Sequence, residues 1–282
     1  MAETALPTAD ELAAPGTCVL PAEDRVEVSI VMPCLNEEQT IGTCIQKALD
    51  ALDRCGVQGE VIVVDNGCTD RSVEIALSFE DRVRVVRQSV PGYGAAYLKG
   101  FSMARGRYVI MGDSDNTYDF GDLPRFLTAL NNGHDMVLGN RFAGGIHPGA
   151  MPWLHRYVGT PLLSAVMNLL YHTDVQDSQS GMRALTREAL AAMHLQCTGM
   201  ELATEMIVKA SRAGLHIGEI PIQYYPRRGQ SKLRSFRDGW RHLRFMLLSV
   251  MDGNQARGSF RSAQVLLARR SEEVNDRCRG DW

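Results

Sequence analysis

The sequence predicts an α/β fold built on a mostly parallel central sheet flanked by helices, and three observations support this. Short β-rich apolar runs alternate with segments of helical period, which is typical of successive β-α-β units. Several of the expected strands are almost continuously apolar, as required when helices cover both faces of a parallel sheet. Polar side chains follow these strands directly, at the edge where such sheets bind ligands.

The order of elements follows from this alternation. Five strands are expected first, at Val28–Met32, Glu60–Val64, Val83–Val86, Tyr108–Met111 and Met136–Leu138. Four helices are expected between and after them, at about Glu38–Arg54, Ser72–Phe79, Ala95–Ala104 and Leu123–Asn131. Beyond Phe142 we expect a Gly/Pro-rich loop, helices at about Leu154–Tyr171 and Met200–Ala213, and an extended stretch at Ile217–Tyr225.

The chain is expected to form one α/β domain over residues 25–233, with additions at both ends. Residues 1–24 are acidic and rich in Ala, Pro and Thr, and we expect them to be disordered. Residues 234–251 predict an amphipathic basic helix, and residues 252–282 a polar tail. The apolar stripe of the helix is Phe236, Trp240, Leu243, Leu247 and Val250; its basic stripe is Arg237, Arg241 and Arg244. This pattern fits either a helix lying on an anionic membrane or one packed on the domain or in a homo-oligomer.

Composition and charge narrow the class of protein. A net charge of -3 over 282 residues gives no basic excess for nucleic acid, so we expect no nucleic-acid partner. The seven cysteines are odd in number, form no C-x-x-C pair and follow no apolar leader, which favours reduced thiols in the cytoplasm. No run approaches the roughly 20 apolar residues that span a bilayer. Any membrane contact is therefore expected to be peripheral, at the inner face.

Charged and polar side chains follow four of the five expected strands. The relevant segments are Pro33–Glu38, Asp65–Asp70, Gly112–Asp115 and Gly139–Arg141. Because the carboxyl ends of parallel strands meet at one edge, these side chains are expected to converge on one crevice. The tripeptide Asp113-Ser114-Asp115 is common by itself, but its place after an apolar strand points to a site.

Asp113 and Asp115 are the expected metal ligands. Two residues apart in extended chain, their carboxylates project to the same side and can share one hard cation. Mg²⁺ or Mn²⁺ held in this way keeps open positions for diphosphate oxygens. The alternative is a solvated acidic turn.

Other residues at this edge are candidates for binding a nucleotide. Asp65 suits a tight turn that presents a carboxylate to a base or ribose, while Asn36 and Glu37 either contact a nucleoside or cap the following helix. Gly94 lies in a glycine-rich segment that fails the G-x-G-x-x-G pattern and follows the third strand, so it disfavours a dinucleotide fold. We expect its backbone to approach the nucleotide closely, with simple helix initiation as the alternative.

Six cations are expected near phosphate groups, although each is also compatible with a solvated surface charge. They are Arg141, Arg156, Arg183, Arg227, Arg228 and Lys232. Arg141, Arg156 and Arg183 are placed at an acceptor phosphate, and Arg141 has the strongest case because it directly follows a strand.

At these motifs the chain resembles family 2 glycosyltransferases, especially the polyprenyl-phosphate (dolichyl-phosphate) hexosyltransferase branch. The resemblance runs from about Val28 to Leu248 and rests on the strand-end segments together with Asp177–Arg183 and Ser231-Lys232-Leu233. It implies a GT-A (Rossmann-like) fold and inverting transfer of a hexose from a UDP- or GDP-sugar, such as UDP-glucose or GDP-mannose. Many members of this branch continue into transmembrane helices, which this chain lacks.

The resemblance also implies roles for individual residues. Pro33, Glu37 and Asp65 would hold the nucleoside, Asp113 and Asp115 the metal, Arg141 and Arg156 the acceptor phosphate, and Arg228 and Lys232 the donor phosphates. Some relatives have a third metal ligand where this chain has Thr117, so the metal would depend more on water and diphosphate.

The acceptor decides whether a base is needed. A phosphate acceptor is already anionic near neutral pH and needs positioning, whereas a hydroxyl needs a base. Asp177 is the first candidate, as base or as orienter of the acceptor, and a loop carboxylate paired with Arg183 is the alternative. Glu201 and Glu205 are second-choice bases. Arg141, Arg156 and the basic helix favour a polyprenyl phosphate; the missing membrane spans favour a soluble acceptor.

Two functions from other classes remain open. A sugar-nucleotide pyrophosphorylase has a similar sheet, but its glycine-rich loop would follow the first strand, where this chain has Pro33-Cys34-Leu35-Asn36. A non-catalytic nucleotide-sugar-binding module is the other alternative.

Overall fold

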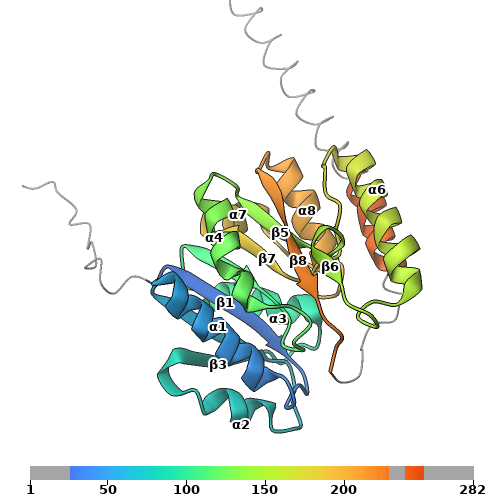
Figure 1. Ribbon diagram of the computed structural model, residues 1–282. Coiled ribbons are helices and arrows are strands. Elements are labelled where there is room, and N and C mark those ends of the chain that lie inside the picture. The colour runs from blue at the N-terminus through green and yellow to red at the C-terminus, as the bar shows by residue number, and fades with distance from the viewer. Residues whose placement is uncertain (1–25, 229–238, 251–282) are drawn as a thin grey trace, which may run out of the picture.

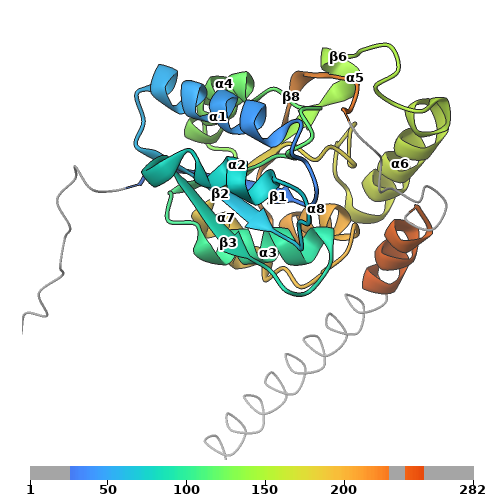
Figure 2. The same cartoon turned by 90° about the horizontal axis from the view of Figure 1, so that it is seen from below.

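The computed structural model describes residues 26–228 and 239–250 (Figure 1). The expected leader, Lys232 and the expected polar tail lie outside these residues, as do Phe236 and Arg237 of the C-terminal amphipathic pattern. The described residues form a central sheet with helices on both of its faces (Figures 1 and 2).

One sheet of eight strands runs through the described part of the chain, in the order β3-β2-β1-β4-β7-β5-β8-β6. The strands are β1 Val28–Cys34, β2 Gly59–Asp65, β3 Val83–Arg87, β4 Tyr108–Met111, β5 Met136–Asn140, β6 Gly145–Ile146, β7 Arg183–Thr186 and β8 Ile217–Tyr224. All neighbouring strands pair in parallel except β7, which runs antiparallel between β4 and β5. The prediction of a mostly parallel central sheet flanked by helices is confirmed.

Helices cover the sheet in two groups. They are α1 Ile41–Cys55, α2 Ser72–Leu77, α3 Tyr93–Met103, α4 Leu123–Asn131, α5 Arg141–Gly144, α6 Thr160–Tyr171, α7 Arg187–Met193 and α8 Leu202–Arg212. The core on one face contains side chains of α1, α2 and α4, and the core on the other contains side chains of α3, α6, α7 and α8. Six of the seven residues of β1 and five of β2 are buried, because helices cover both faces of these strands.

The first helix shows how the sequence produces this packing. Its apolar positions recur at helical spacing, and Ile41, Ile45 and Leu52 are fully or almost fully buried against the sheet. Gly56 follows the helix with φ of 63°, a left-handed conformation that glycine adopts without a Cβ clash. The chain then turns back into β2.

The segment before α6 and the C-terminal helix frame one end of the molecule. Residues His155–Gly159 form a π-helical turn that leads into α6. Residues 239–250 are helical, within the expected 234–251, and lie beside α6 in both views (Figures 1 and 2). The hydroxyl of Tyr171 at the end of α6 donates to the carbonyl of Met246, 2.6 Å away. Across the described residues, no helix combines the length and apolarity that crossing a membrane requires.

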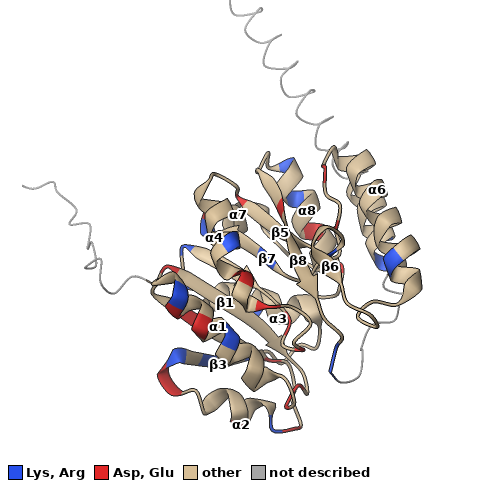
Figure 3. Cartoon of the chain, viewed as in Figure 1, with Lys and Arg blue, Asp and Glu red and all other residues tan. Residues whose placement is uncertain are grey.

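Charged residues are spread along the described part of the chain. In the view of Figure 3, basic and acidic residues alternate over the helices and loops, and no continuous basic face is seen. This distribution agrees with the modest net charge of -3.

Candidate active site

The carboxyl ends of β1, β2 and β4 lie side by side, because the three strands pair in parallel. Residue Cys34 stands opposite Asp65 in this register, and β4 ends at Met111 just before Asp113. The hydroxyl of Ser114, between the two expected metal ligands, donates to the carbonyl of Pro33, 2.6 Å away. Three of the four predicted strand-end segments therefore meet at one edge.

Asp113 and Asp115 lie in the chain that leaves β4. The extended conformation expected for both is wrong, because Asp115 belongs to a turn in which Asn116 has φ of 60°. In that turn Asp115 Oδ1 accepts from the amide of Thr117 at 3.1 Å and from its hydroxyl at 2.6 Å. Thr117 thus orients Asp115.

The two carboxylates are close enough to influence each other. Burial and then the negative charge of Asp115 raise the pKa of Asp113 to about 7. The hydroxyl of Tyr97 donates to Asp113 Oδ1 at 3.1 Å and so favours the charged form. A close pair of carboxylates, Asp115 buried and Asp113 partly exposed, is electrostatically prepared for a cation, which would remove the mutual repulsion.

Arg227 links this pair to Glu37. Its Nη2 lies 2.5 Å from Glu37 Oε1, and its Nη1 lies 3.3 Å from Asp115 Oδ2. Arg227 also lines a cleft of about 490 Å³ together with Lys47, Arg228 and other residues of the Asn116–Asp119 and Tyr225–Arg228 segments. Sequence reasoning placed Arg227 only among the cations near phosphates. Its adjacency to Asp115 depends on the chain after β8 returning to the end of β4.

The expected nucleoside-binding residues form a second part of the same edge. Asp65 Oδ1 accepts from the amides of Gly67 and Cys68, at 3.0 and 2.8 Å, which makes the tight turn predicted for this position. Asn36 has φ of 56°, and its Oδ1 accepts from the amide of Thr69 at 2.8 Å. The turns after β1 and β2 therefore support each other.

Gly94 has a different role from the expected one. A Cβ at this position would collide with the carbonyls of Cys197 and Gly199, and one at Gly92 would collide with the carbonyl of Thr198. The start of α3 is thus glycine-rich because it packs on the 197–199 loop. The expectation that Gly94 brings backbone close to a nucleotide is wrong, since that space is filled by protein.

Asp177 forms a buried ion pair with Arg141. Its two carboxylate oxygens accept from Arg141 Nη2 and Nε, both at 2.7 Å, and Oδ2 also accepts from the Arg141 amide at 3.0 Å. Asp177 is completely buried. A carboxylate that is enclosed and already accepts three hydrogen bonds is not placed to take a proton from a substrate, so its expected role as base is corrected to that of holding Arg141. Its alternative pairing with Arg183 is also wrong.

Arg141 is held between this carboxylate and an aromatic ring. Its guanidinium carbon lies 4.9 Å from the centre of the Tyr224 ring. Burial, the largest single effect, would lower the pKa of Arg141, but the charge and hydrogen bonds of Asp177, together with Tyr118 and Tyr224, raise it overall. Burial and the charge of Arg141 also lower the pKa of His155, so the turn carrying Arg156 lies near Arg141. The expected pairing of Arg141 and Arg156 in one region is therefore compatible with the structure.

Arg183 cannot serve an acceptor phosphate. It is fully buried on β7, and its Nε, Nη1 and Nη2 donate to the carbonyls of Ser180, Ala203 and Ser178 at 2.9, 2.7 and 2.9 Å. These contacts brace the 178–180 segment against α8. The expectation is wrong because the antiparallel strand β7 carries this side chain into the core.

The second-choice bases also have structural partners. Glu205 is 2% exposed and accepts from the amides of Gln196 and Cys197, with the Lys209 ammonium 2.7 Å away. Glu201 Oε1 accepts from Arg241 of the C-terminal helix at 3.0 Å. Glu205 therefore holds a loop, and Glu201 anchors the helix of residues 239–250.

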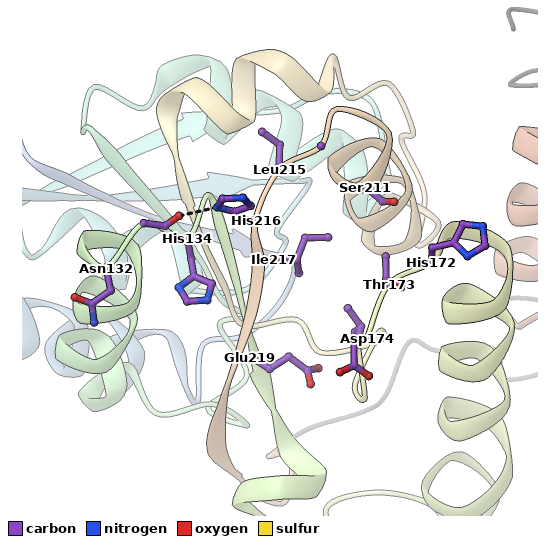
Figure 4. A pocket seen from close by; sticks show the side chains of 13 residues that line it. Asn132, His134, His172, Thr173, Asp174, Ser211, Leu215, His216, Ile217 and Glu219 are labelled. Atoms are coloured by element: carbon purple, nitrogen blue, oxygen red, sulfur yellow. Dashed lines mark hydrogen bonds between the residues drawn. The ribbon is translucent and has the colours of Figure 1, made fainter.

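A separate hollow of about 610 Å³ lies at the other edge of the sheet (Figure 4). His134, His216 and Glu219 line it, at the amino ends of β5 and β8. Because β4 runs parallel to these strands, the Asp113 edge is at the opposite end. In the described residues, no group of three or more His, Cys, Asp or Glu side chains is placed to hold a metal, in this hollow or elsewhere.

Comparison with known proteins agrees with this arrangement. Residues 29–193 match the model of glycosyl transferase family 2. The low-salt glycan biosynthesis hexosyltransferase Agl6 of Haloferax volcanii is 48% identical over 224 residues, covering 79% of this chain and 54% of that protein. This chain thus spans about half the length of Agl6. The dolichyl-phosphate hexose transferase of the same organism is 35% identical over 215 residues, covering 76% of this chain and 89% of that protein.

Solved structures share the fold. Glucosyl-3-phosphoglycerate synthase of Mycobacterium tuberculosis with phosphoglyceric acid aligns with a TM-score of 0.64 at 24% identity, covering 81% of this chain and 80% of that one. The same enzyme with Mn²⁺ and UDP-glucose aligns with a TM-score of 0.61 at 25% identity, covering 81% and 79%. The mostly parallel sheet is therefore that of GT-A glycosyltransferases. The chain belongs to glycosyl transferase family 2.

Proposed function

We propose that this chain is a metal-dependent, inverting hexosyltransferase that moves a hexose from a UDP- or GDP-sugar to a polyprenyl phosphate. The observation that carries the proposal is the carboxylate pair Asp113 and Asp115 at the carboxyl end of β4, with Arg227 against it. Two carboxylates beside an arginine-lined cleft suit a metal-bound diphosphate better than any other common ligand.

The two carboxylate ligands fit a divalent cation. Asp113 and Asp115 would hold Mg²⁺ or Mn²⁺, which neutralises the charge that develops on the leaving diphosphate. Burial and the neighbouring carboxylate of Asp115 raise the pKa of Asp113, an effect that a bound cation would oppose, and a structure of the synthase from M. tuberculosis contains Mn²⁺ with UDP-glucose. Water and diphosphate oxygens would complete the coordination, because Thr117 donates its hydroxyl to Asp115.

The donor would lie along the ends of β1, β2 and β4. Asp65, Asn36, Glu37 and Pro33 line the side proposed for the nucleoside, at the turns after β1 and β2. Arg227 and Arg228 line the cleft beside Asp115 and would contact the diphosphate. To do so, Arg227 would exchange a carboxylate partner for phosphate oxygens, which keeps its charge compensated throughout.

The acceptor would be oriented by Arg141 and Arg156. A phosphate oxygen is already anionic near neutral pH, so attack on the anomeric carbon opposite the diphosphate needs alignment and no protein base. Asp177 fixes the Arg141 guanidinium in a bidentate pair, which sets its direction. This division of roles accounts for the burial of Asp177.

A lipid acceptor is supported by a set of large exposed apolar side chains on α6, the segment before it and the helix of residues 239–250. We call this the α6 apolar surface; its residues and exposed fractions are Trp153 69%, Tyr157 58%, Leu162 60%, Leu169 77%, Trp240 63% and Leu247 47%. The helix buries His242, Met246 and Ser249, so it packs on the domain and still presents apolar residues outward. Aromatic and aliphatic side chains beside Arg156 suit the surface of an anionic membrane.

A screen of donors and acceptors tests this proposal. UDP- and GDP-sugars would be incubated with Mn²⁺ or Mg²⁺ and a short polyprenyl phosphate in detergent, and release of nucleoside diphosphate and formation of glycolipid would be measured. We expect both products with at least one donor, and neither with Asp113→Asn. If no donor yields product with any acceptor, while Asp113→Asn binds nucleotide as well as the wild type, the chain is a non-catalytic nucleotide-sugar-binding module.

A soluble phosphate acceptor is the second candidate. It is supported by the fold shared with an enzyme whose structures contain phosphoglyceric acid or glucosyl-3-phosphoglycerate. The same screen with small phosphorylated acceptors distinguishes the two, because only a lipid acceptor should depend on the α6 apolar surface. Formation of nucleotide sugar from a sugar phosphate and a nucleoside triphosphate would instead indicate a pyrophosphorylase.

A further inference from the structure

Two cysteines, one at the end of a strand and one in a neighbouring turn, meet beside the proposed nucleoside site. Cys34 ends β1, and Cys68 lies in the turn after β2, which returns toward β1 because Cys34 pairs with Asp65 across the parallel ladder. The two sulfurs are 3.7 Å apart. A disulfide requires about 2.05 Å between sulfurs, so a local movement of the turn would be enough to close the bond.

The surroundings of the two thiols differ in a way that favours oxidation. Cys34 is 1% exposed, whereas Cys68 is partly exposed. Cys68 Sγ also accepts from the amide of Asn36 at 3.4 Å. The hydrogen bond with Cys34 and then that with Asn36 lower the pKa of the Cys68 thiol, against the effect of burial, while the pKa of Cys34 is raised. Cys68 is therefore the accessible, more nucleophilic sulfur, and Cys34 is the neighbour that can resolve it.

We propose that Cys34 and Cys68 form a reversible oxidation site at which a peroxide creates a disulfide that weakens donor binding. The Cys68 thiolate attacks one oxygen of hydrogen peroxide, forming a sulfenic acid and releasing hydroxide, which takes up the proton that the Cys68 thiol had lost and becomes the first water. The Cys34 sulfur then attacks the Cys68 sulfur, the S–O bond breaks, and the departing hydroxyl takes the Cys34 proton to leave as water. Together, two thiols are oxidised to one disulfide and one peroxide is reduced to two waters.

The effect on the donor rests on the proposed function, because it involves the expected nucleoside ligands. The Cys68 amide donates to Asp65 Oδ1 at 2.8 Å, and its sulfur accepts from the Asn36 amide. Thr69, the next residue, donates to Asn36 Oδ1 at 2.8 Å. Drawing Cys68 toward Cys34 therefore displaces the hydrogen bonds that orient both Asp65 and Asn36. We expect donor affinity to fall on the order of tenfold, within the usual range of coupling between sites.

The test uses the full chain, first reduced and then treated with a small molar excess of hydrogen peroxide. Non-reducing peptide mapping locates any linked cysteines, and calorimetry with UDP- and GDP-sugars plus Mn²⁺ measures donor affinity before and after treatment. We expect a Cys34–Cys68 linked peptide, weaker donor binding, and recovery of both after dithiothreitol. Cys68→Ser should form no link, and its own donor affinity should be the same before and after peroxide. Cys34→Ser should instead leave Cys68 as a sulfenic acid that reacts with a dimedone probe.

A matched control is Cys55→Ser, because Cys55 is partly exposed at the far end of α1 and should leave the response to peroxide unchanged. The proposal is overturned if consumed peroxide leaves no Cys34–Cys68 link, or if the link forms and donor affinity is unchanged. If the reduced chain binds no nucleotide sugar, the proposed function fails, and the effect on donor binding fails with it. Peptide mapping still decides in that case whether peroxide forms the Cys34–Cys68 disulfide.

Discussion

Arg227 contacts both acidic groups that flank the donor cleft, at 2.5 Å from Glu37 and 3.3 Å from Asp115. Its Nε is buried and makes no hydrogen bond within the described residues. The terminal nitrogens of this guanidinium lie beside the cleft proposed for the donor, where they can exchange a carboxylate for a diphosphate oxygen. At the scale of single residues, Arg227 is therefore the side chain on which donor binding should depend most, after the carboxylate pair.

We predict that Arg227→Ala weakens binding of a nucleotide sugar in the presence of Mn²⁺ by tenfold or more, on the order of the loss of one charge-assisted hydrogen bond. Arg228→Ala should have a smaller effect, because Arg228 lines the same cleft but is exposed. Isothermal titration calorimetry on both variants provides the comparison. Equal losses at the two positions would count against the special role given to Arg227.

Asp177 offers a second test at this scale. If it only holds Arg141, then Asp177→Asn and Arg141→Ala should impair transfer through a weaker apparent affinity for the acceptor, and the double variant should be little worse than either alone. The pH profile of kcat should keep its shape in Asp177→Asn. If the pH profile of Asp177→Asn instead lost one of its two sloping sides, Asp177 would be the catalytic base.

At the scale of elements, Glu60 links β2 to β1, to β3 and to the segment before β4. It lies on β2, 5% exposed, and accepts from Ser29 of β1, Arg84 of β3 and Arg105 before β4. Burial would raise the pKa of Glu60, but the hydrogen bonds from Arg105, Arg84 and Ser29 hold it at about 2. This depressed pKa means that Glu60 stabilises the fold in its charged form.

The lowered pKa of Glu60 sets how the free energy of unfolding changes with pH. The stabilisation by Glu60 is fully present above its unfolded pKa of 4.5 and is lost as pH falls toward 2. Glu60→Gln should therefore lower the free energy of unfolding by up to about 3 kcal/mol at pH 7, and the gap from the wild type should narrow at pH 3. Urea denaturation at both pH values measures this. The exposed Glu74, which pairs with Arg71 on the surface, supplies the control Glu74→Gln, which should change little.

The elements differ in how far sequence could predict them. Strands β1 and β2 are continuously apolar and bounded by turns, so periodicity found them to within two residues. Strand β7 was missed, because four residues that pair antiparallel with two distant strands leave no local pattern. The same cause explains the error on Arg183: its burial depends on the strand that sequence reasoning did not find.

Some features of the candidate site could likewise be predicted from sequence, and others could not. The positions of Asp65, Asp113 and Asp115 follow from a general rule for the ends of parallel strands, so sequence could predict them. The partners of Asp177 and Arg227 could not be predicted, since a charged residue type does not reveal which distant residue it will pair with. Gly94 was misread because a glycine needed for protein packing looks the same in sequence as one needed for a ligand.

At the scale of the whole molecule, we propose that the residues of the α6 apolar surface bring the enzyme to a membrane. We predict that a Leu169→Ser/Trp240→Ser variant binds anionic lipid vesicles at least about tenfold more weakly, because two large exposed apolar side chains no longer enter the membrane. Co-sedimentation with vesicles measures this. Leu77→Ser on α2 is the control, since Leu77 is 57% exposed and lies outside this surface. Unchanged binding of the double variant would favour a soluble acceptor.

The central claim is that Asp113 and Asp115 bind a divalent cation together with the diphosphate of a nucleotide sugar. Calorimetric titration of UDP and GDP into the chain, with and without Mn²⁺, tests it most directly. The account predicts that one of these nucleotides binds tightly only with Mn²⁺, and that Asp113→Asn abolishes the metal-dependent part while leaving the fold intact by circular dichroism. Nucleotide binding that is equally tight without metal, or unchanged in Asp113→Asn, would contradict it.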